Sequence, residues 1–274
     1  MRFGGVIVMK YSVSIASLAA VAAIIGLSGS AQAQQFNWTG LYVGGEVGGG
    51  WGQSRSIFQG NNGDPDPNGN PNPTHMFVAP IAPGAGPDPF SLSGAIGGLK
   101  ADYLIQSGGL VMGVGGAYDW SGIKGSSQVG INNAGPVYGD VNVKSLALIN
   151  GKLGVANGSW LAYAEAGVAI GNYDASVYGT CGNGKCQFSQ NGSATHTGWD
   201  AGAGISYAIS NNLIFGVEYN HIDLGSSNVT LNETLSNGNP DDFYQVRKFD
   251  PALDVVKATL SWKFGGDRAP APLK

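Results

Sequence analysis

The stretch LIFGVEYNHIDL, residues 213–224, alternates apolar and polar positions. One face of this segment carries Leu213, Phe215, Val217 and Tyr219, and the other carries Ile214, Gly216, Glu218 and Asn220. A repeat of two is typical of a β-strand whose two faces meet different surroundings. The same alternation recurs in TGWDAGAGISYAI (197–209) and DVVKATLSWKF (254–264). The chain is therefore predicted to be built from amphipathic strands.

The composition of the two faces predicts which of them points outward. The polar face is mostly glycine, serine and charged residues, which would pack a poor hydrophobic core. The apolar face is aromatic at its ends, as in the girdles of membrane barrels. We therefore expect the apolar face to meet lipid. The predicted lipid-facing girdle is Trp51, Trp199, Tyr207, Tyr219, Trp262 and Phe264.

The spacing of the strands predicts their topology. Eight strands are expected, at about 38–52, 91–106, 110–121, 141–156, 160–173, 197–209, 212–224 and 251–264. Short Gly- and Asn-rich turns (107–109, 157–159, 210–212) alternate with long connections (53–90, 122–140, 174–196, 225–250). This pattern predicts an all-β fold, an eight-stranded antiparallel up-and-down transmembrane β-barrel.

The inward face then supplies a candidate site, a network of ion pairs in the lumen. Its predicted members are Glu46, Lys100, Asp102, Asp119, Lys144, Lys152, Glu165, Asp200, Glu218, Lys257 and Lys263. Acids and bases are nearly balanced, as required where unpaired charges out of water are costly. An eight-stranded barrel is just wide enough to be filled by side chains. A continuous water path with weak conduction, and a β-sandwich with a solvated polar face, remain alternatives.

The N-terminal segment has the features of an export signal. Arg2 and Lys10 precede the apolar run 13–27, and Ala31-Gln32-Ala33 fits the cleavage pattern. Met9 could be the true start. The predicted divisions are a signal peptide at 1–33, a barrel domain at 34–266 and a Pro-rich tail at 267–274.

Composition narrows the class of partner. Without Arg2 and Lys10, 12 basic residues remain against 18 acidic ones, a balance that argues against nucleic acid. Charged residues make up 12% of the chain, which is low for a water-exposed surface. No apolar run after the signal reaches the length of a membrane helix. Together with the export signal, these features predict a protein of the cell outer membrane.

Three local motifs suggest chemistry at first sight. Gly179 to Lys185 fits a phosphate-binding loop in spacing, but Cys186 follows where Ser or Thr is needed. Cys181 and Cys186 are better interpreted as a disulfide formed after export. The segment 64–69 resembles the start of a calcium loop, but His75 stands where a bidentate Glu is required.

The histidines do not predict an enzyme. His221 precedes Ser226 and Ser227 by five and six residues, and a histidine base beside a serine nucleophile is a catalytic pairing. No acid–base–nucleophile set emerges around them. The sequence therefore predicts no catalytic, cofactor or metal site.

Several strands resemble a known family. WTGLYVGGEVGGGWG (38–52), SLALINGKLGVA (145–156), LAYAEAGVAIG (161–171) and VKATLSWKFGG (256–266) are similar to strands of small porin-like outer-membrane barrels of α-proteobacteria, the outer-membrane immunogenic protein type. The resemblance covers 36–266. It implies an eight-stranded barrel, contact with outer-membrane lipids, insertion by the outer-membrane assembly machinery and exposed antigenic loops.

The resemblance also implies candidate roles. Members have been linked to envelope integrity, haem binding and host contact. We expect a structural or porin-like barrel that contributes to envelope integrity. The alternative is a surface binding or adhesion protein that acts through its long loops on haem or a host surface.

Overall fold

The computed structural model describes residues 36–61, 88–132, 135–180, 187–235 and 240–265. The expected signal peptide (1–33), the C-terminal tail (267–274), the calcium-like segment (64–69) and both cysteines lie outside the described residues. These expectations therefore stay predictions.

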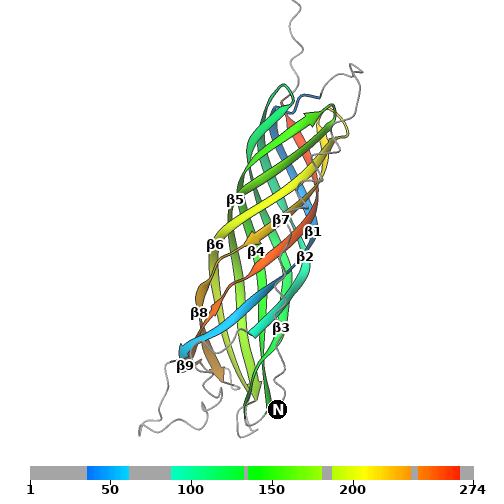
Figure 1. Ribbon diagram of the computed structural model, residues 1–274. Helices are drawn as coiled ribbons and strands as arrows, with labels where there is room; N and C mark the ends of the chain where they lie inside the picture. The colour runs from blue at the N-terminus through cyan, green and yellow to red at the C-terminus, as the bar shows by residue number, and fades with distance from the viewer. Residues whose placement is uncertain (1–35, 62–87, 133–134, 181–186, 236–239, 266–274) are drawn as a thin grey trace, which may run out of the picture. The chain divides into compact units, whose positions relative to one another are not determined.

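The described residues form ten strands, all paired antiparallel (Figure 1). They are β1 (Gly40–Asn61), β2 (Asp88–Ser107), β3 (Leu110–Asn132), β4 (Gly135–Asn157), β5 (Trp160–Thr180), β6 (Gln187–Ala208), β7 (Leu213–Asp223), β8 (Ser227–Leu235), β9 (Pro240–Phe249) and β10 (Ala252–Phe264). The tight turns at 107–109 and 157–159 occur where they were expected. Gly108 (φ +62°) and Gly158 (φ +59°) adopt the left-handed conformation that glycine accepts without strain.

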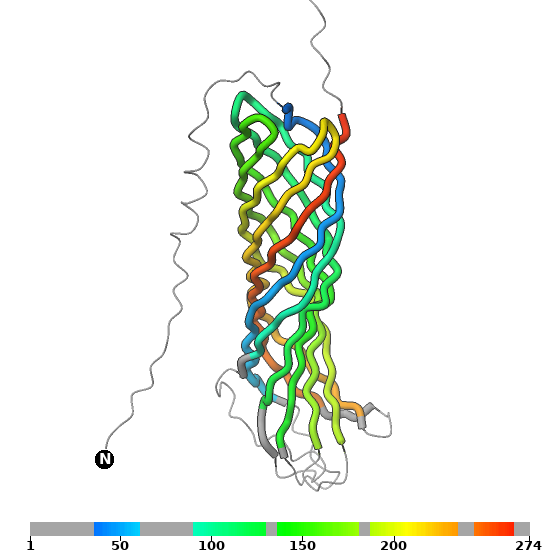
Figure 2. Tube along the Cα trace, turned by 90° about the vertical axis from the view of Figure 1, so that its right-hand side faces the viewer, coloured from blue at the N-terminus to red at the C-terminus, as the bar shows by residue number. Residues whose placement is uncertain are grey.

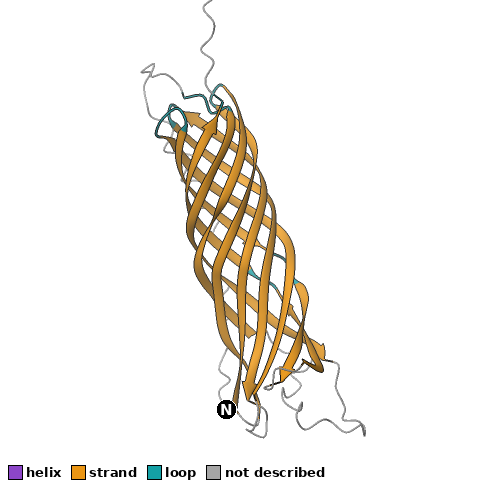
Figure 3. Cartoon of the chain, turned by 180° about the vertical axis from the view of Figure 1, so that it is seen from behind, coloured by secondary structure: helices purple, strands orange, loops and turns teal. Residues whose placement is uncertain are grey.

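Pairing of the first strand with the last closes the sheet. β1 and β10 are in register from Leu41↔Phe264 to Gln53↔Ala252, and they lie side by side in blue and red in Figure 2. Strands β1 to β7 and β10 thus form a closed ring of eight. The eight-stranded antiparallel up-and-down barrel predicted from the sequence is confirmed. Figure 3 shows the described part of the chain as strands joined by loops.

A second ring of eight continues beyond the first. β7 ends at Asp223, and the strand paired with it, β10, begins at Ala252. Between them, β8 pairs with β6 and β9 pairs with β1, so the β8–β9 hairpin replaces β7 and β10 in the wall. We call the ring closed by β7 and β10 the turn-end barrel, and the ring closed by β8 and β9 the extension.

The extension corrects the predicted long connections. The described parts of segments 53–90, 122–140, 174–196 and 225–250 are largely strand, and β1 to β6 each run for 20–23 residues. That is about twice the length needed to cross a bilayer. Apolar and polar residues still alternate in these segments, but here the apolar residues face inward and the polar residues face outward. The segments therefore do not show the outward apolar face by which the other strands were predicted.

The polarity of the wall reverses between the two rings. On β5, Val168 and Ile170 point outward in the turn-end barrel, while Glu165 points inward. Further along the same strand, Asp174 points outward and Tyr173 inward. The inside of the extension holds a hydrophobic core of Ile123, Val141, Val143, Leu146, Leu231, Leu253 and their neighbours. A buried polar group of Gln190, Glu233, Gln245 and Arg247 lies in the same interior. The expectation that apolar side chains face outward and polar side chains face inward therefore holds for the turn-end barrel alone.

Candidate functional site: the lumen of the turn-end barrel

Lys152 is the centre of one ion cluster inside the turn-end barrel. Its Nζ lies 2.9 Å from Glu165 Oε2, 3.1 Å from Asp102 Oδ1 and 3.4 Å from Glu218 Oε1. Lys100 pairs with Glu218 and lies 3.6 Å from Asp102 Oδ2. All five side chains are at most 11% exposed. Four strands thus contribute charges to one buried group, in which each lysine touches more than one carboxylate.

Uncharged polar side chains complete this cluster. The Tyr163 hydroxyl donates to Glu218, and Asn220 Nδ2 donates to Glu165 Oε1 over 2.6 Å. Lys152 Nζ also lies 4.8 Å from the centre of the Tyr163 ring. Sequence reasoning named the charges and placed Asn220 on the polar face without including it in the network, and it missed Tyr163. Both occupy inward positions of the same alternation, which is the signal that could have found them.

Lys257 is the centre of a second group near the barrel seam. Its Nζ lies 2.6 Å from Glu46 Oε1 and 3.4 Å from Asp119 Oδ2, and all three residues are buried. On the facing wall, Asn150 Nδ2 donates to Asp200 Oδ2 over 3.3 Å. Every strand of the turn-end barrel therefore places at least one polar side chain in the lumen.

Two predicted members of the ion network, Lys263 and Lys144, lie apart from both ion clusters. Lys263 points inward at the turn end, where its Nζ donates to Asn37 O and stands 4.7 Å from the centre of the Phe36 ring. Lys144 is on the outer surface, where its Nζ lies 3.2 Å from Asp174 Oδ2. Its assignment to the lumen was wrong. A β-bulge between Val143 and Ser145 adds one residue to β4, and this shift reverses the face on which Lys144 lies.

Apolar clusters lie on both sides of the polar network. At the turn end, a cluster of Trp38, Tyr42, Leu104, Val111, Leu161, Ile214 and neighbours fills the barrel. On the other side, the network meets the hydrophobic core of the extension. Cavities of about 30 Å³ and about 10 Å³ remain beside Lys100 and Lys152. A single water needs roughly 10–15 Å³. These cavities therefore have room for isolated waters at most.

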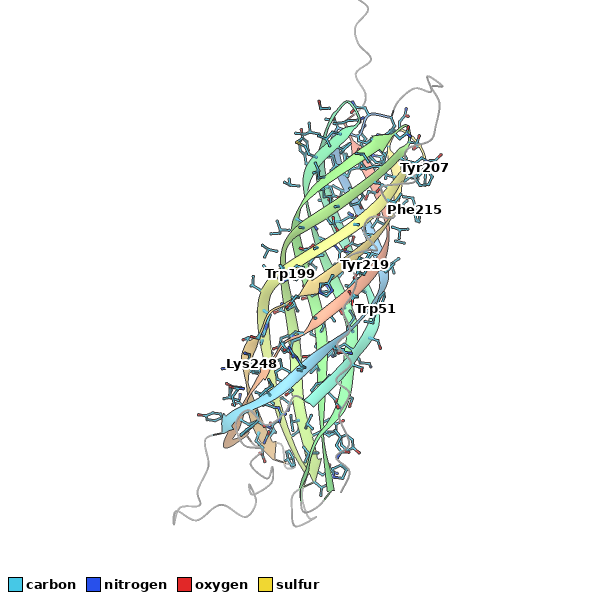
Figure 4. All side chains as sticks on the ribbon, viewed as in Figure 1. Trp51, Trp199, Tyr207, Phe215, Tyr219 and Lys248 are labelled. Carbon is cyan, nitrogen blue, oxygen red and sulfur yellow. The ribbon has the colours of Figure 1, made fainter. Side chains whose placement is uncertain are left out.

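The six predicted girdle residues are all exposed on the outer wall. Four of them, Trp51, Trp199, Tyr207 and Tyr219, are labelled in Figure 4. Trp51, Trp199, Tyr207, Tyr219, Trp262 and Phe264 are 39–50% exposed. Trp160 packs against Tyr207 with ring centres 4.7 Å apart, close to the turns. Tyr219 donates to Asp254 Oδ1 over 2.6 Å, at the border with the extension. Outward aromatics therefore bound an apolar band around the turn-end barrel.

The histidines are placed without a catalytic arrangement in the described part of the chain. His221 Nδ1 lies 2.9 Å from Asp254 Oδ1. The Ser227 hydroxyl donates to Asn228 O over 3.4 Å, and Ser226 is exposed. His196 is buried in the extension, and His75 lies outside the described residues.

The described residues include no helix that is both long and apolar enough to cross a membrane. The same residues include no group of three or more His, Cys, Asp or Glu side chains placed to hold a metal ion.

A closed antiparallel barrel with an outward apolar band, aromatic rims and a polar interior is an outer-membrane β-barrel. Residues 19–264 match the family described as "Outer membrane protein beta-barrel domain". The chain belongs to this family, and its location is the cell outer membrane.

Curated relatives point to the same family. Over 138 residues the chain is 28% identical to the 31 kDa outer-membrane immunogenic proteins of Brucella melitensis biotype 1 and Brucella suis biovar 1. The alignment covers 50% of this chain and 56% of each relative, so the chain spans about half the length of the curated relatives it matches.

Solved structures show weaker similarity. The outer membrane protease OmpT of Escherichia coli is 9% identical with a TM-score of 0.46, over 86% of this chain and all of that one. The outer membrane protein OprG of Pseudomonas aeruginosa is 11% identical with a TM-score of 0.41, over 84% of this chain and 99% of that one. The fold assignment above depends on the strand pairing and not on these two similarities.

Proposed function

We propose that this protein is a structural outer-membrane barrel that contributes to envelope integrity and keeps its lumen closed to solutes. The observation that carries the proposal is the order of layers along the barrel axis. A buried ion network lies between an apolar cluster at the turn end and the apolar core of the extension.

Physical chemistry explains why these layers oppose conduction. An ion that crosses an apolar layer loses its hydration without gaining ligands, which costs several kcal/mol or more. Within the network, Lys152 and Lys257 already hold the carboxylates that could bind a passing cation. A porin of larger ring size instead encloses an aqueous channel. In this proposal the protein resembles a porin in its barrel fold, and it does not conduct ions.

Planar-bilayer recording of the refolded protein tests the closed lumen. We expect a flat current trace under conditions in which a large porin, refolded in parallel, gives stable steps. Refolding is checked by heat-modifiable migration on gels. Regular conductance steps that scale with protein concentration would contradict the closed lumen.

Envelope integrity calls for a separate test in cells. A strain that lacks the gene should become more sensitive to detergent combined with a chelator, and the wild-type gene should restore resistance. Unchanged sensitivity would remove the proposed role, whatever the conductance result.

We further infer that the outward band contacts outer-membrane lipids and that the outer-membrane assembly machinery inserts the barrel. The support is the exposure of the aliphatic side chains of Leu99, Ile149 and Val217 on the outer wall of the turn-end barrel, where a water-facing surface would carry charged residues. A catalytic role is not part of the proposal. If that is correct, His221→Ala leaves growth and envelope lipid composition unchanged.

A second candidate is surface binding or adhesion through the loops. It is favoured by the extension, because strands such as β3 and β4 continue well beyond the apolar band. Deletion of 62–87 and 236–239 should then abolish binding to haem or host cells while barrel migration on gels is retained. Full binding by the deletion variant would exclude this candidate.

A further inference from the structure

The outer wall of the extension carries a row of side chains that includes two stacked tyrosines. Register places Gln128 opposite Tyr138, Tyr138 opposite Tyr178, and Tyr178 opposite Ser189, across β3 to β6. The two tyrosine rings are stacked, with centres 6.0 Å apart and an angle of 28° between planes. They are 40% and 37% exposed. Two aromatic rings thus project together from a wall that faces away from the core.

A second row runs beside the first, one step nearer the turn-end barrel. It consists of Ser126, Asp140, Ser176, Asn191 and Asn232, which are successive cross-strand partners. The Tyr178 hydroxyl donates to Asp140 Oδ1 over 3.5 Å and so links the two rows. We call the two rows together the tyrosine face.

The tyrosine face has few charges for a surface outside the membrane. Asp140 is its single charged side chain, and the others are hydroxyls, amides and the two tyrosines. Water-facing surfaces usually carry a quarter or more of charged residues. Tyr, Ser and Asn are the residue types on which antibody combining sites depend. Tyrosine there supplies rigid amphipathic area, and the small polar residues supply adaptable hydrogen bonds.

The position of this face indicates what lies beside it. Tyr178 follows Ile170, the last outward aliphatic residue of β5, by eight residues. At about 3.3 Å per residue and a tilt of roughly 40°, the tyrosine rings stand about 20 Å outside the apolar band. Asn172 and Asp174 separate the rings from the apolar band along the outer face of β5, so the face lies on the side of the barrel beyond the lipid. Sugar chains that extend from lipids of the surrounding leaflet would reach it.

We propose that the tyrosine face is a lateral binding site for an uncharged oligosaccharide, supplied by the sugar chains of the surrounding outer-leaflet glycolipid. The C–H face of a sugar ring packs against the Tyr138 and Tyr178 rings. Its hydroxyls exchange hydrogen bonds with Asn191, Ser176 and Ser189, which can donate and accept. A phosphate-directed site would need Lys or Arg here, and the face has neither. The proposal depends neither on the closed lumen nor on the loops.

Calorimetry with the refolded protein in detergent micelles tests the proposal. The probe is the oligosaccharide fraction released from purified lipopolysaccharide and separated from its phosphorylated lipid part. We expect binding that the double variant Tyr138→Ser, Tyr178→Ser weakens tenfold or more. The double variant Tyr138→Phe, Tyr178→Phe should retain most of the affinity, because the ring faces persist.

A matched control is available on the outer wall of the turn-end barrel. Tyr103 on β2 is 49% exposed and lies outside the tyrosine face, so Tyr103→Ser should bind like the wild type. Heat-modifiable migration checks that every variant is folded. The proposal is overturned if the wild type binds no oligosaccharide, or if the serine double variant binds as well as the wild type. Equal loss with Tyr103→Ser, or binding only to a host-type glycan, would overturn it as well.

Discussion

Lys257 Nζ lies 2.6 Å from Glu46 Oε1, across the seam where the last strand of the turn-end barrel meets the first. Glu46 and Lys257 are 211 positions apart in the chain, and both are buried. Asp119 Oδ2, 3.4 Å from the same ammonium, belongs to β3 on another part of the wall. The seam is therefore joined by backbone pairing and by a buried ion pair.

Removal of the seam cation should destabilise the barrel strongly. Lys257→Met leaves Glu46 and Asp119 buried without their ammonium partner, and breaking a buried pair in this way costs about 3–5 kcal/mol. Urea unfolding in micelles, followed by tryptophan fluorescence, measures the effect. The matched control is Lys144→Met, because the exposed Lys144–Asp174 pair contributes at most about 1 kcal/mol. Equal unfolding midpoints for the two variants would contradict the prediction.

Two neighbouring glycines of β1 should respond differently to alanine. A Cβ on Gly48 would stand 1.9 Å from Val256 O on β10, so Gly48→Ala should impair closure of the barrel. A Cβ on Gly49 would meet nothing nearer than Gly94 O at 3.7 Å. Gly49→Ala should be neutral, or stabilising by about 0.4–1 kcal/mol through the unfolded chain. Refolding yield on gels and urea midpoints distinguish the two variants.

Substitution of single outward residues by arginine can locate the boundary between the lipid-facing wall and the water-facing wall. Val47→Arg places a cation in the outward apolar band, where it should cost about 2–4 kcal/mol in a bilayer. Ser193→Arg places the same side chain on the outside of the extension and should change stability by less than about 0.5 kcal/mol. Unfolding in lipid vesicles measures both. A larger loss at Ser193 would show that lipid covers the extension.

The core of the extension should be separable from the turn-end barrel. Leu231 on β8 is fully buried, so Leu231→Ala should cost about 2–5 kcal/mol locally. Its outward neighbour Thr230 is exposed, and Thr230→Ala serves as the control. We expect faster proteolysis of the β8–β9 hairpin in the first variant, with migration of the turn-end barrel unchanged. Loss of all folded protein would mean that the two rings unfold as one unit.

Acid should loosen the extension through His196. Burial lowers the pKa of His196 from 6.5, and the ring lies between the Tyr173 hydroxyl (2.8 Å from Nε2) and Leu224 O (3.3 Å from Nδ1). The neutral ring satisfies both contacts, with Nδ1–H as donor to the carbonyl and Nε2 as acceptor. Because the folded pKa is below the unfolded one, the unfolded state gains a proton first as pH falls through about 6.5. The stability of the extension therefore falls with pH in this range.

Hydrogen exchange of β6 and β8 at pH 7.5 and pH 5 measures this acid effect. The variant His196→Gln should lose the pH dependence while it retains a polar side chain at the site. Equal pH dependence in the wild type and in the variant would assign the effect to other groups.

Most of the turn-end barrel could be predicted from the sequence. Alternation in 213–224 and 254–264 marked the outward and inward faces, and the Gly- and Asn-rich turns marked three hairpins. Lys144 could not be placed correctly, because a one-residue bulge changes the face without changing the pattern of residue types. The extension was missed for a related reason: β8 and β9 carry few outward apolar residues, and the inward face of β9 places Gln245 and Arg247 beside Phe249, so neither face shows a plain apolar alternation.

Sequence alone determined that this chain makes amphipathic antiparallel strands with few charges and polar, glycine-rich inner faces. These properties are local, because side-chain direction in a strand follows from residue parity. Tertiary structure decided which strands close the ring, where polarity reverses, and that Glu46 and Lys257 meet at the seam. It also decided that Tyr138 and Tyr178 stack on the outer wall. These outcomes depend on the register between strands far apart in the chain, which no single segment encodes.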